Sequence, residues 1–308
     1  MSTPAQSLPA RVTLPKAARG RSTNQWLRRQ PLTVQAMVLV LRSPTGLVGS
    51  VVVVVLLGLA ICAPLVAPYS PYEQHPLNVL QPPSGDFWFG TDELGRDLFS
   101  RVVYGARVSF VVGVIATAIG AGVGVATGLL SGYQGGWVDS VIMRCYDALL
   151  AFPGIIIGIA VISILGPSSI NVAYALALGS MPFFARLMRS SVLSEREREY
   201  VFAALCIGAG DRRIMVRHVL PNTLPPLLVQ LSLAMGFAIL AEASLSFLGL
   251  GTQPPDPSWG SMLNDSRTYL REAPWYGLWP GLALTVLLVA LNFVSDALRD
   301  ALDPRRMR

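Results

Sequence analysis

The stretch that decides the fold is Glu195–Asn222, EREREYVFAALCIGAGDRRIMVRHVLPN. It opens with alternating Glu and Arg, continues with small residues and ends with a basic segment before Pro221. The apolar runs on either side are long enough to cross a bilayer. Because a plain connector could be far shorter, the stretch indicates a docking surface outside the membrane. We expect it to contain a short basic helix that Asp211 caps and Pro221 ends.

The composition places the rest of the chain in a membrane. Of its 308 residues 52% are hydrophobic and 14% are charged, against about 25% charged in soluble domains. The net charge of +6 does not indicate nucleic-acid binding, because the basic residues are segregated between loops. The three cysteines lack metal or disulfide spacing. We therefore expect no metal site, and we expect Cys62, Cys145 and Cys206 to pack as small apolar side chains.

Six apolar runs predict an all-α integral membrane protein with six transmembrane helices. The expected helices cover residues 47–66, 108–130, 141–165, 172–188, 224–248 and 278–298. The first follows a basic arm, residues 1–46, and is expected to be a retained signal anchor. The expected division is then an external segment (67–107), a five-helix core (108–298) that includes the 195–222 stretch, and a tail (299–308).

The basic residues predict which side of the membrane each segment occupies. Arg and Lys concentrate on the cytoplasmic side of membrane proteins. With six spans and the N-terminus inside, 19 of the 24 Lys and Arg residues fall in inner segments. The rule therefore predicts cytoplasmic termini and a cytoplasmic 195–222 stretch.

The second expected helix carries small residues at every fourth position. The stripe consists of Ala116, Gly120, Gly124 and Gly128. Such a stripe allows a neighbouring helix to approach closely. It therefore predicts helix packing.

Two carboxylates fall within expected spans. Asp147, with Arg144 one turn earlier, lies near the inner end of its helix, and Glu242 lies near the outer end of its own. A carboxylate in lipid is costly, so both should face protein or water. Either they fix helix packing through hydrogen bonds, or they line a gate or pathway.

The external segment contains Gly90–Ser109, GTDELGRDLFSRVVYGARVS. Its motif residues are Gly90, Thr91, Asp92, Gly95, Arg96 and Asp97. From the residues alone, it reads as an amphipathic interface helix with Asp/Arg pairs of little individual strength.

Both patterned stretches resemble those of permease subunits of ABC importers. Ala203, Ala204, Gly208, Leu220 and Pro221 match the EAA loop of these permeases. Phe202 and His218 depart from the general pattern in the way that dipeptide and oligopeptide importers do. The Gly90–Ser109 motif resembles the C-type subunit of the same importers.

This resemblance implies a type I importer permease fold in a bacterial inner membrane and an ATP-driven importer of peptides. It implies three kinds of protein partner besides membrane lipid: a second, B-type permease, two ATPase subunits and an extracytoplasmic substrate-binding protein. ATP and Mg²⁺ would be held by the ATPase subunits. No cofactor is expected on this chain. The implied ATPase-coupling residues are Ala203, Ala204, Gly208, Ala209, Asp211, Arg212, Arg213, His218 and Pro221.

An enzyme is a poor alternative, because the sequence has no P-loop and no GxSxG motif. A proton-coupled secondary carrier is the best competitor from another class. It would favour carboxylates at the bilayer midplane and internal repeats. The sequence shows no clear repeat.

Overall fold

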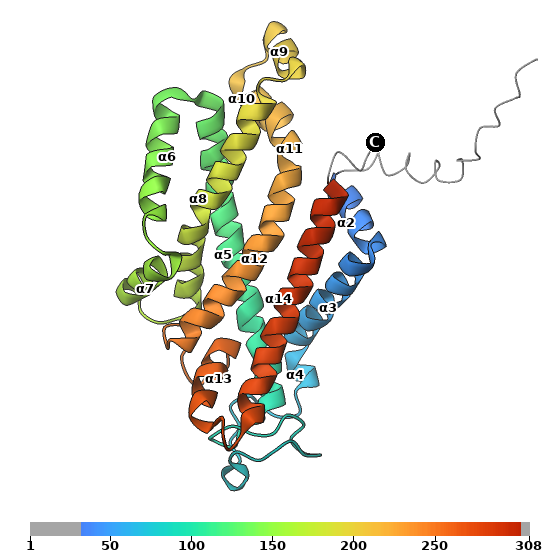
Figure 1. Cartoon of the computed structure of the whole chain (residues 1–308), viewed down its shortest axis with the longest axis vertical. Helices are drawn as coiled ribbons and strands as arrows, with labels where there is room; N and C mark the ends of the chain where they lie inside the picture. Colours follow the sequence, from blue (N-terminus) through green and yellow to red (C-terminus); the bar gives the residue numbers. More distant parts are fainter. Residues whose placement is uncertain (1–31, 303–308) are drawn as a thin grey trace, which may run out of the picture.

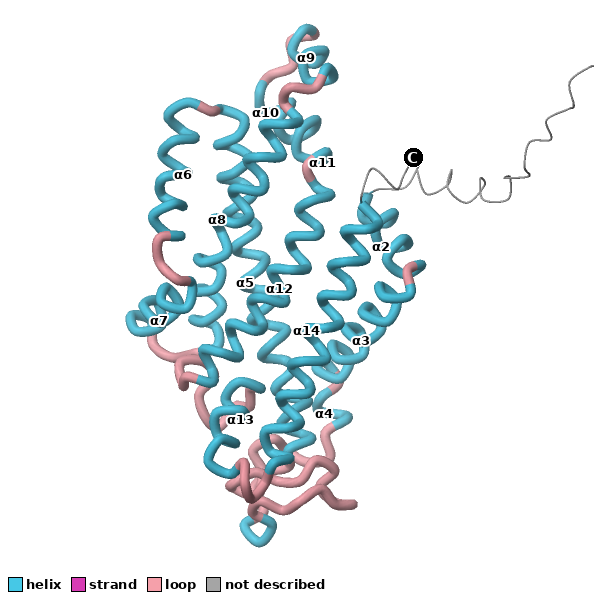
Figure 2. The backbone as a smooth tube through the Cα atoms, viewed as in Figure 1, coloured by secondary structure: helices cyan, strands magenta, loops and turns pink. Residues whose placement is uncertain are grey.

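The computed structural model describes residues 32–302. All the named secondary-structure elements in this part are helices (Figures 1 and 2). The first half comprises α2 (Leu32–Arg42), α3 (Pro44–Ile61), α4 (Ala63–Val66), η1 (Pro76–Asn78), α5 (Leu98–Gln134), α6 (Gly136–Leu150), α7 (Gly154–Leu165) and α8 (Ser169–Glu195). The second half comprises α9 (Glu199–Cys206), α10 (Asp211–Ile214), η2 (Met215–Val219), α11 (Leu220–Asn222), α12 (Leu224–Phe247), α13 (Trp259–Ser266), η3 (Arg267–Tyr269) and α14 (Pro274–Leu302).

Among the described residues, five helices are long and apolar enough to cross a membrane: α3, α5, α8, α12 and α14. Helices α6 and α7 are apolar enough to cross the membrane together, but they meet at 89°. They supply a sixth span if the pair is counted as one broken crossing. The all-α, multi-span fold is therefore confirmed. The single helix expected over 141–165 is wrong, since it breaks at Ala151–Pro153. Pro153 lies at the break, and a residue before proline is disfavoured in helical geometry.

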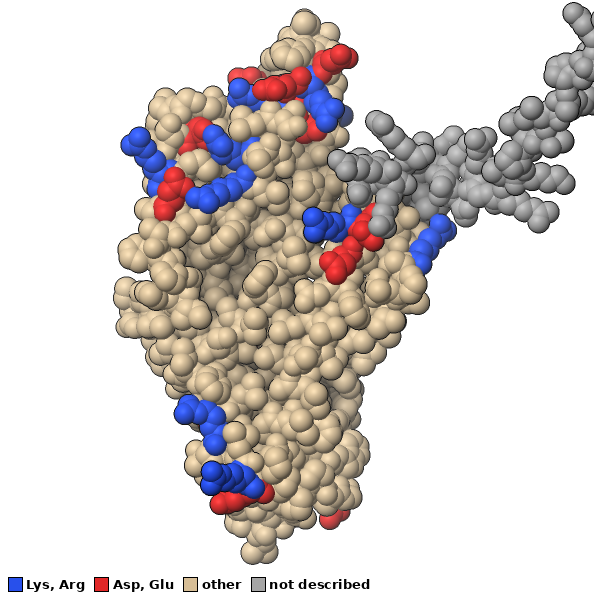
Figure 3. Space-filling view, in the orientation of Figure 1, with Lys and Arg blue, Asp and Glu red and all other residues tan. Residues whose placement is uncertain are grey.

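The bundle has two distinct ends (Figure 1). One end carries residues 195–222, and we call it the loop end. The opposite end carries the irregular segment between α4 and α5 together with α13, and we call it the cap end. The described chain starts and finishes toward the loop end. Lys and Arg gather mainly toward that end on the face shown in Figure 3.

The most extensive helix pair is α5 with α8. The small-residue stripe of α5 lies at this contact. A Cβ at Gly124 would lie 2.6 Å from the Met181 carbonyl oxygen, and a Cβ at Gly128 would overlap the Ala185 carbonyl. At Gly120 a Cβ would overlap the Ser180 hydroxyl and lie 3.1 Å from the Ala177 carbonyl oxygen. The backbones are thus close enough that only glycine fits, as in other membrane helix pairs.

Several helices are longer than their apolar runs. Helix α5 begins at Leu98 because the Asp97 carboxylate accepts a hydrogen bond from the Ser100 amide at 2.8 Å, an N-cap. Helices α8 and α14 continue through Pro182 and Pro280, both of which are buried. The expected bounds of these spans were therefore too narrow.

The N-terminal part also contains α2, which no sequence pattern predicted. Residues 1–31 of the basic arm lie outside the described residues, as does the tail from 303 onward. Helices α2 and α3 pack on α14. At Gly49 a Cβ would lie 2.6 Å from the Ala290 carbonyl oxygen.

The cysteines do not pack in the core of this chain. Cys62, Cys145 and Cys206 are all exposed in the single chain. The expected packing of these residues as small apolar side chains therefore does not take place within this chain. Sequence spacing does not indicate which face of a helix a cysteine occupies.

Candidate functional site: the loop between α8 and α12

The 195–222 loop folds as two short helices joined by a glycine turn. Helix α9 ends at Cys206, and the chain reverses at Gly208, whose φ of +80° lies in the left-handed region. The second segment runs from α10 through the π-helical turn η2 to α11. The expected short basic helix is therefore present, but in a mixed helical form.

Both expected boundaries of that helix are wrong. The N-cap residue is Gly210, and Asp211 is the first helical residue, without a capping hydrogen bond. The Asp211 carboxylate instead accepts a hydrogen bond from the Tyr133 hydroxyl. Pro221 lies within α11, which ends one residue later, at Asn222.

The inner face of the loop is part of an apolar core. Its four buried side chains pack against the loop-end residues of α5, α8 and α12. The loop contributes Val201, Ala204, Ile214 and Val219, and the helices contribute Leu129, Phe184, Met188, Val192 and Leu227, among others. This burial makes the loop an ordered extension of the bundle.

Polar contacts fasten the two halves of the loop to each other. The Tyr200 hydroxyl donates to Glu195 Oε2 at 2.8 Å. Asn222 Nδ2 donates to the Tyr200 hydroxyl at 3.1 Å and to the His218 carbonyl at 2.7 Å. Burial and the neighbouring Glu195 carboxylate raise the pKa of Tyr200, so its hydroxyl keeps the proton that it donates. Residues at the two ends of the loop therefore form one unit.

Two further contacts fasten the loop to α5. The Tyr133 hydroxyl lies 3.0 Å from Asp211 Oδ1. Arg196 Nη1 donates to the carbonyls of Gly132 and Tyr133 at 3.2 and 3.3 Å. The sequence could not indicate these partners, because they lie more than 60 residues apart along the chain.

The outer face of the loop exposes apolar, small and basic side chains together. Ile207 is 86% exposed. The other exposed members are Phe202, Ala203, Leu205, Gly208, Arg212, Arg213, Val216 and Arg217. An open hollow of about 630 Å³ lies among Gly210, Asp211, Arg212, Arg213, Val216 and Arg217. Exposed apolar groups beside charged ones are typical of an interaction surface.

The structure divides the candidate loop residues into two groups. Ala203, Gly208, Asp211, Arg212, Arg213 and Pro221 are exposed, whereas Ala204 is buried and Ala209 and His218 are half-buried. Ala204 thus belongs to the apolar core. At Gly208 no other side chain or backbone atom lies within 4 Å of a built Cβ. Within this chain, glycine is therefore required there by its φ angle.

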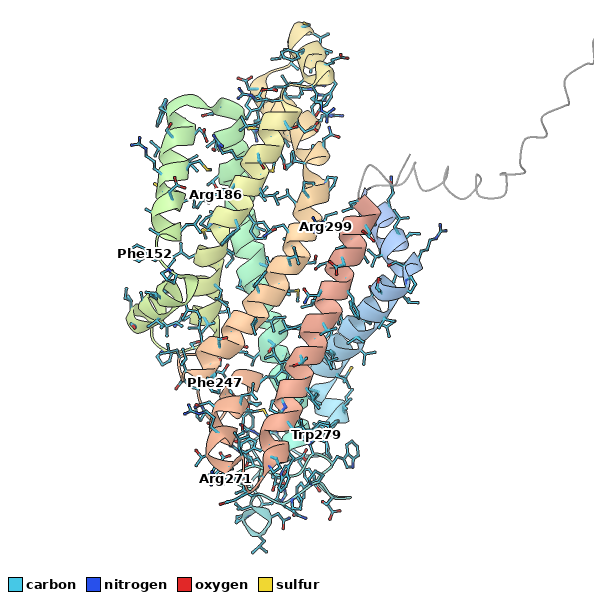
Figure 4. The ribbon with its side chains drawn as sticks, in the orientation of Figure 1. Phe152, Arg186, Phe247, Arg271, Trp279 and Arg299 are labelled. Atoms are coloured by element: carbon cyan, nitrogen blue, oxygen red, sulfur yellow. The ribbon has the colours of Figure 1, made fainter. Side chains whose placement is uncertain are left out.

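Asp147, one of the two candidate pathway residues, forms an ion pair. Arg186 Nη2 donates to its carboxylate at 2.6 Å, and the two side chains are 52% and 60% exposed. Figure 4 labels Arg186 on α8 where α8 faces α6. The Arg144 neighbour noted in the sequence is not the partner. The pair borders a hollow of about 420 Å³ that also includes Asp139 and Arg189.

Glu242, the other candidate, is fully buried near the cap end of α12. Ser246, one turn later, donates to its Oε1 at 2.7 Å, and Oε2 has no hydrogen-bond partner within the described chain. The Ser246 hydroxyl also accepts from the Thr252 amide at 3.4 Å. Glu242 thus lies in protein rather than lipid and supports the turn after α12.

The external motif forms a buried polar turn rather than an amphipathic helix. Asp92 Oδ1 accepts the backbone amides of Leu94 and Arg96, and its Oδ2 accepts Arg96 Nε at 2.6 Å. Arg101 Nε lies 3.4 Å from the same oxygen. Because Asp92, Arg96 and Arg101 are all buried, the expectation of exposed, weak Asp/Arg pairs is wrong.

The remaining motif residues shape this turn. Gly90 and Gly95 have φ angles of +79° and +71°, and a Cβ at either would overlap or crowd a backbone carbonyl. Thr91 bridges the turn through the Asn78 carbonyl and the Gln81 amide. Trp279, labelled in Figure 4, stacks on Phe89 with the ring centroids 4.0 Å apart. The motif therefore builds the cap end.

Fold and loop together describe a multi-span membrane protein with an ordered loop at one end that exposes apolar and basic side chains. Residues 124–308 match the family described as binding-protein-dependent transport system inner membrane component. Residues 31–83 match the N-terminal TM domain of oligopeptide transport permease C. The chain therefore belongs to the family of binding-protein-dependent transport system inner membrane components, a family of transporter subunits.

Several relatives agree over most of the chain. A dipeptide transport system permease protein from Alkalihalophilus pseudofirmus is 46% identical over 264 residues, covering 86% of this chain and 87% of the relative. A glutathione transport system permease protein from Escherichia coli O157:H7 is 44% identical, covering 86% and 88%. A di/tripeptide transport system permease protein from Pseudomonas aeruginosa is 45% identical, covering 80% and 83%. The resemblance to peptide-importer permeases is confirmed.

The fold is also that of a solved ABC importer. An inward-facing form of the MetNI methionine ABC transporter matches with a TM-score of 0.55 at 18% identity, covering 66% of this chain and 96% of that chain. At this identity the likeness shows the fold alone. The expected importer permease fold is confirmed, and the proton-coupled carrier is not supported.

Proposed function

We propose that this chain is one permease subunit of an ATP-driven importer of short peptides, and that its 195–222 loop docks on an ATPase. The observation that carries the docking role is the loop itself. Its inner face is fixed to α5, α8 and α12, while its outer face exposes apolar and basic side chains in an ordered shape. A surface ordered before binding loses little entropy when a partner arrives.

The proposed complex contains one copy of this chain and one copy of a different permease, which together enclose the path. Two ATPase subunits, which hold ATP and Mg²⁺, bind at the loop end. A substrate-binding protein docks at the cap end. ATP-driven movement of the ATPases shifts the bundle between two states, because the docked subunits bind the two states with different affinities.

The orientation belongs to the proposal. The described residues 32 and 302 both lie toward the loop end (Figure 1), and 19 of 24 basic residues fall in segments assigned to that side. The positive-inside rule then places the loop end in the cytoplasm of a bacterium, at its inner membrane.

The peptide cargo rests on the relatives, whose names give dipeptides, di/tripeptides and glutathione. Reconstitution in proteoliposomes tests the proposal. The chain would be combined with its partner permease, ATPases and binding protein, and uptake of labelled dipeptide, tripeptide and glutathione would be followed. We expect uptake only with ATP. Uptake that a proton gradient alone drives would overturn the proposal.

A further inference from the structure

Helix α5 stands apart from the other helices that pack on the 195–222 loop. Helices α8 and α12 continue directly into the loop, so any movement of the loop reaches them through the chain. Helix α5 has no such covalent connection, and it holds the loop only by contacts. Its apolar contacts with the loop, such as those of Leu129 in the core cluster, are non-directional. Directional contacts are needed to fix its register.

Those directional contacts come from two side chains. Tyr133, one residue from the end of α5, donates to Asp211 at the start of α10, at 3.0 Å. Arg196 reaches the last carbonyls of α5 at 3.2 and 3.3 Å. A guanidinium at a helix C-terminus also offsets the helix dipole there. Both halves of the loop are thus hydrogen-bonded to the C-terminal end of α5.

The other end of α5 is fastened just as firmly to the cap end. Asp97 caps the helix through Ser100. Arg101, in its first turn, lies 3.4 Å from buried Asp92 and donates to the Pro71 carbonyl at 3.0 Å. Between these anchors α5 runs for 37 residues without a proline, about 55 Å of helix. One rigid element therefore joins the loop to the cap.

We infer that Tyr133 and Asp211 are positioning residues that transmit movement of the 195–222 loop to α5, and through α5 to the cap end. The inference rests on the proposed function, since the movement is that of a docked ATPase. Without the Tyr133–Asp211 hydrogen bond, α8 and α12 move with the docked ATPases and α5 does not move fully with them. ATP hydrolysis then continues with less import for each ATP.

The test uses the assembled transporter in proteoliposomes and measures peptide imported for each ATP hydrolysed. Tyr133→Phe removes only the donor, and Asp211→Ala removes only the acceptor. Each should lower the ratio about fivefold, the effect of roughly 1 kcal/mol. The double variant should lower it no further, because both changes remove one contact. Asp211→Asn keeps an acceptor oxygen and should retain most of the ratio.

A matched control is available on the same helix. The Tyr146 hydroxyl of α6 lies 2.7 Å from the Thr127 hydroxyl of α5, a tyrosine contact that does not involve the loop. Tyr146→Phe should leave the ratio unchanged. An unchanged ratio in Tyr133→Phe, with the unmodified protein active, would overturn the inference. Additive losses in the double variant would also overturn it. An unmodified complex that fails to import would instead overturn the proposed function.

Discussion

Asp139 and Arg189 are joined by two hydrogen bonds, from Nε to Oδ1 at 2.5 Å and from Nη2 to Oδ2 at 2.6 Å. This two-point contact joins α6 to α8. The carboxylate also accepts from Ser131 of α5. Three helices therefore meet at one carboxylate, whose side chain is only 19% exposed.

Arg189→Ala should lower the free energy of unfolding by about 1–3 kcal/mol, because it leaves Asp139 half-buried without its charged partner. Arg189→Lys should recover only part of this, since an ammonium cannot make the paired contact. Denaturant titration in detergent micelles measures both. The matched control is Asp147→Ala, whose pair with Arg186 is exposed and should contribute at most about 1 kcal/mol. An equal loss of unfolding free energy in Arg189→Ala and Asp147→Ala would contradict the larger contribution expected of the Asp139–Arg189 pair.

Gly128→Ala should destabilise the bundle by roughly 1–3 kcal/mol, because its Cβ would overlap the Ala185 carbonyl and force α5 away from α8. Gly122 lies on the same helix with no atom within 4 Å of a built Cβ. Gly122→Ala should be neutral or stabilise by up to about 1 kcal/mol, as expected for Ala in a helix. Thermal unfolding of the two purified variants makes the comparison. A loss confined to Gly122→Ala would be inconsistent with this packing.

Asp92→Ala should destabilise the cap end by about 3–5 kcal/mol, because it leaves the buried guanidinium groups of Arg96 and Arg101 without their shared carboxylate. Glu73→Ala is the control, since that carboxylate is 49% exposed and lies 3.9 Å from His75. It should change stability by less than about 1 kcal/mol. Protease resistance of the segment between α4 and α5 reports the local effect. Normal resistance in Asp92→Ala would count against a structural role.

Gly208→Glu should abolish import while leaving membrane insertion intact, because a long charged side chain blocks the proposed docking surface. Its φ of +80° adds backbone strain of about 1–2 kcal/mol for most residues. Gly208→Asn separates the two effects, since Asn adopts this region more readily. If docking needs the space, Gly208→Asn also loses import.

The control for this pair is Gly136, the first residue of α6. It too has a positive φ, +57°, and open space around a built Cβ, but it lies outside the 195–222 loop. Gly136→Asn and Gly136→Glu should retain import. Normal uptake by Gly208→Asn would show that only the backbone angle matters at position 208.

Much of this fold could be predicted, because its signals are local. Hydropathy located the spans, and the four-residue spacing of Gly120, Gly124 and Gly128 indicated a packing face that depends only on helix geometry. The loop was recognised from its length and patterning. Its small and basic residues can be read from the sequence, but which of them are exposed cannot, since Ala204 is buried and Ala209 is half-buried.

What could not be predicted depends on distant partners. Asp is a common N-cap residue, but the Asp211 carboxylate accepts a hydrogen bond from Tyr133, which lies 78 residues away along the chain. Asp92 and Arg96 look like surface pairs until the cap buries them. The position of a proline in the sequence also does not determine whether a helix breaks there. Exposed Pro153 accompanies a break between α6 and α7, whereas buried Pro182 sits within a continuous α8. Packing around each residue determines these outcomes.

The central claim is that the 195–222 loop touches an ATPase, and a thiol crosslink tests it most directly. Arg212→Cys would be placed in a variant without the three native cysteines, and the assembled complex would be treated with a short bifunctional maleimide. Leu77→Cys, 99% exposed at the cap end, is the control. We expect residue 212 to crosslink to the ATPase, and residue 77 to crosslink to no ATPase. If residue 212 gives no such crosslink, or is labelled by an impermeant maleimide from outside intact cells, the account is contradicted.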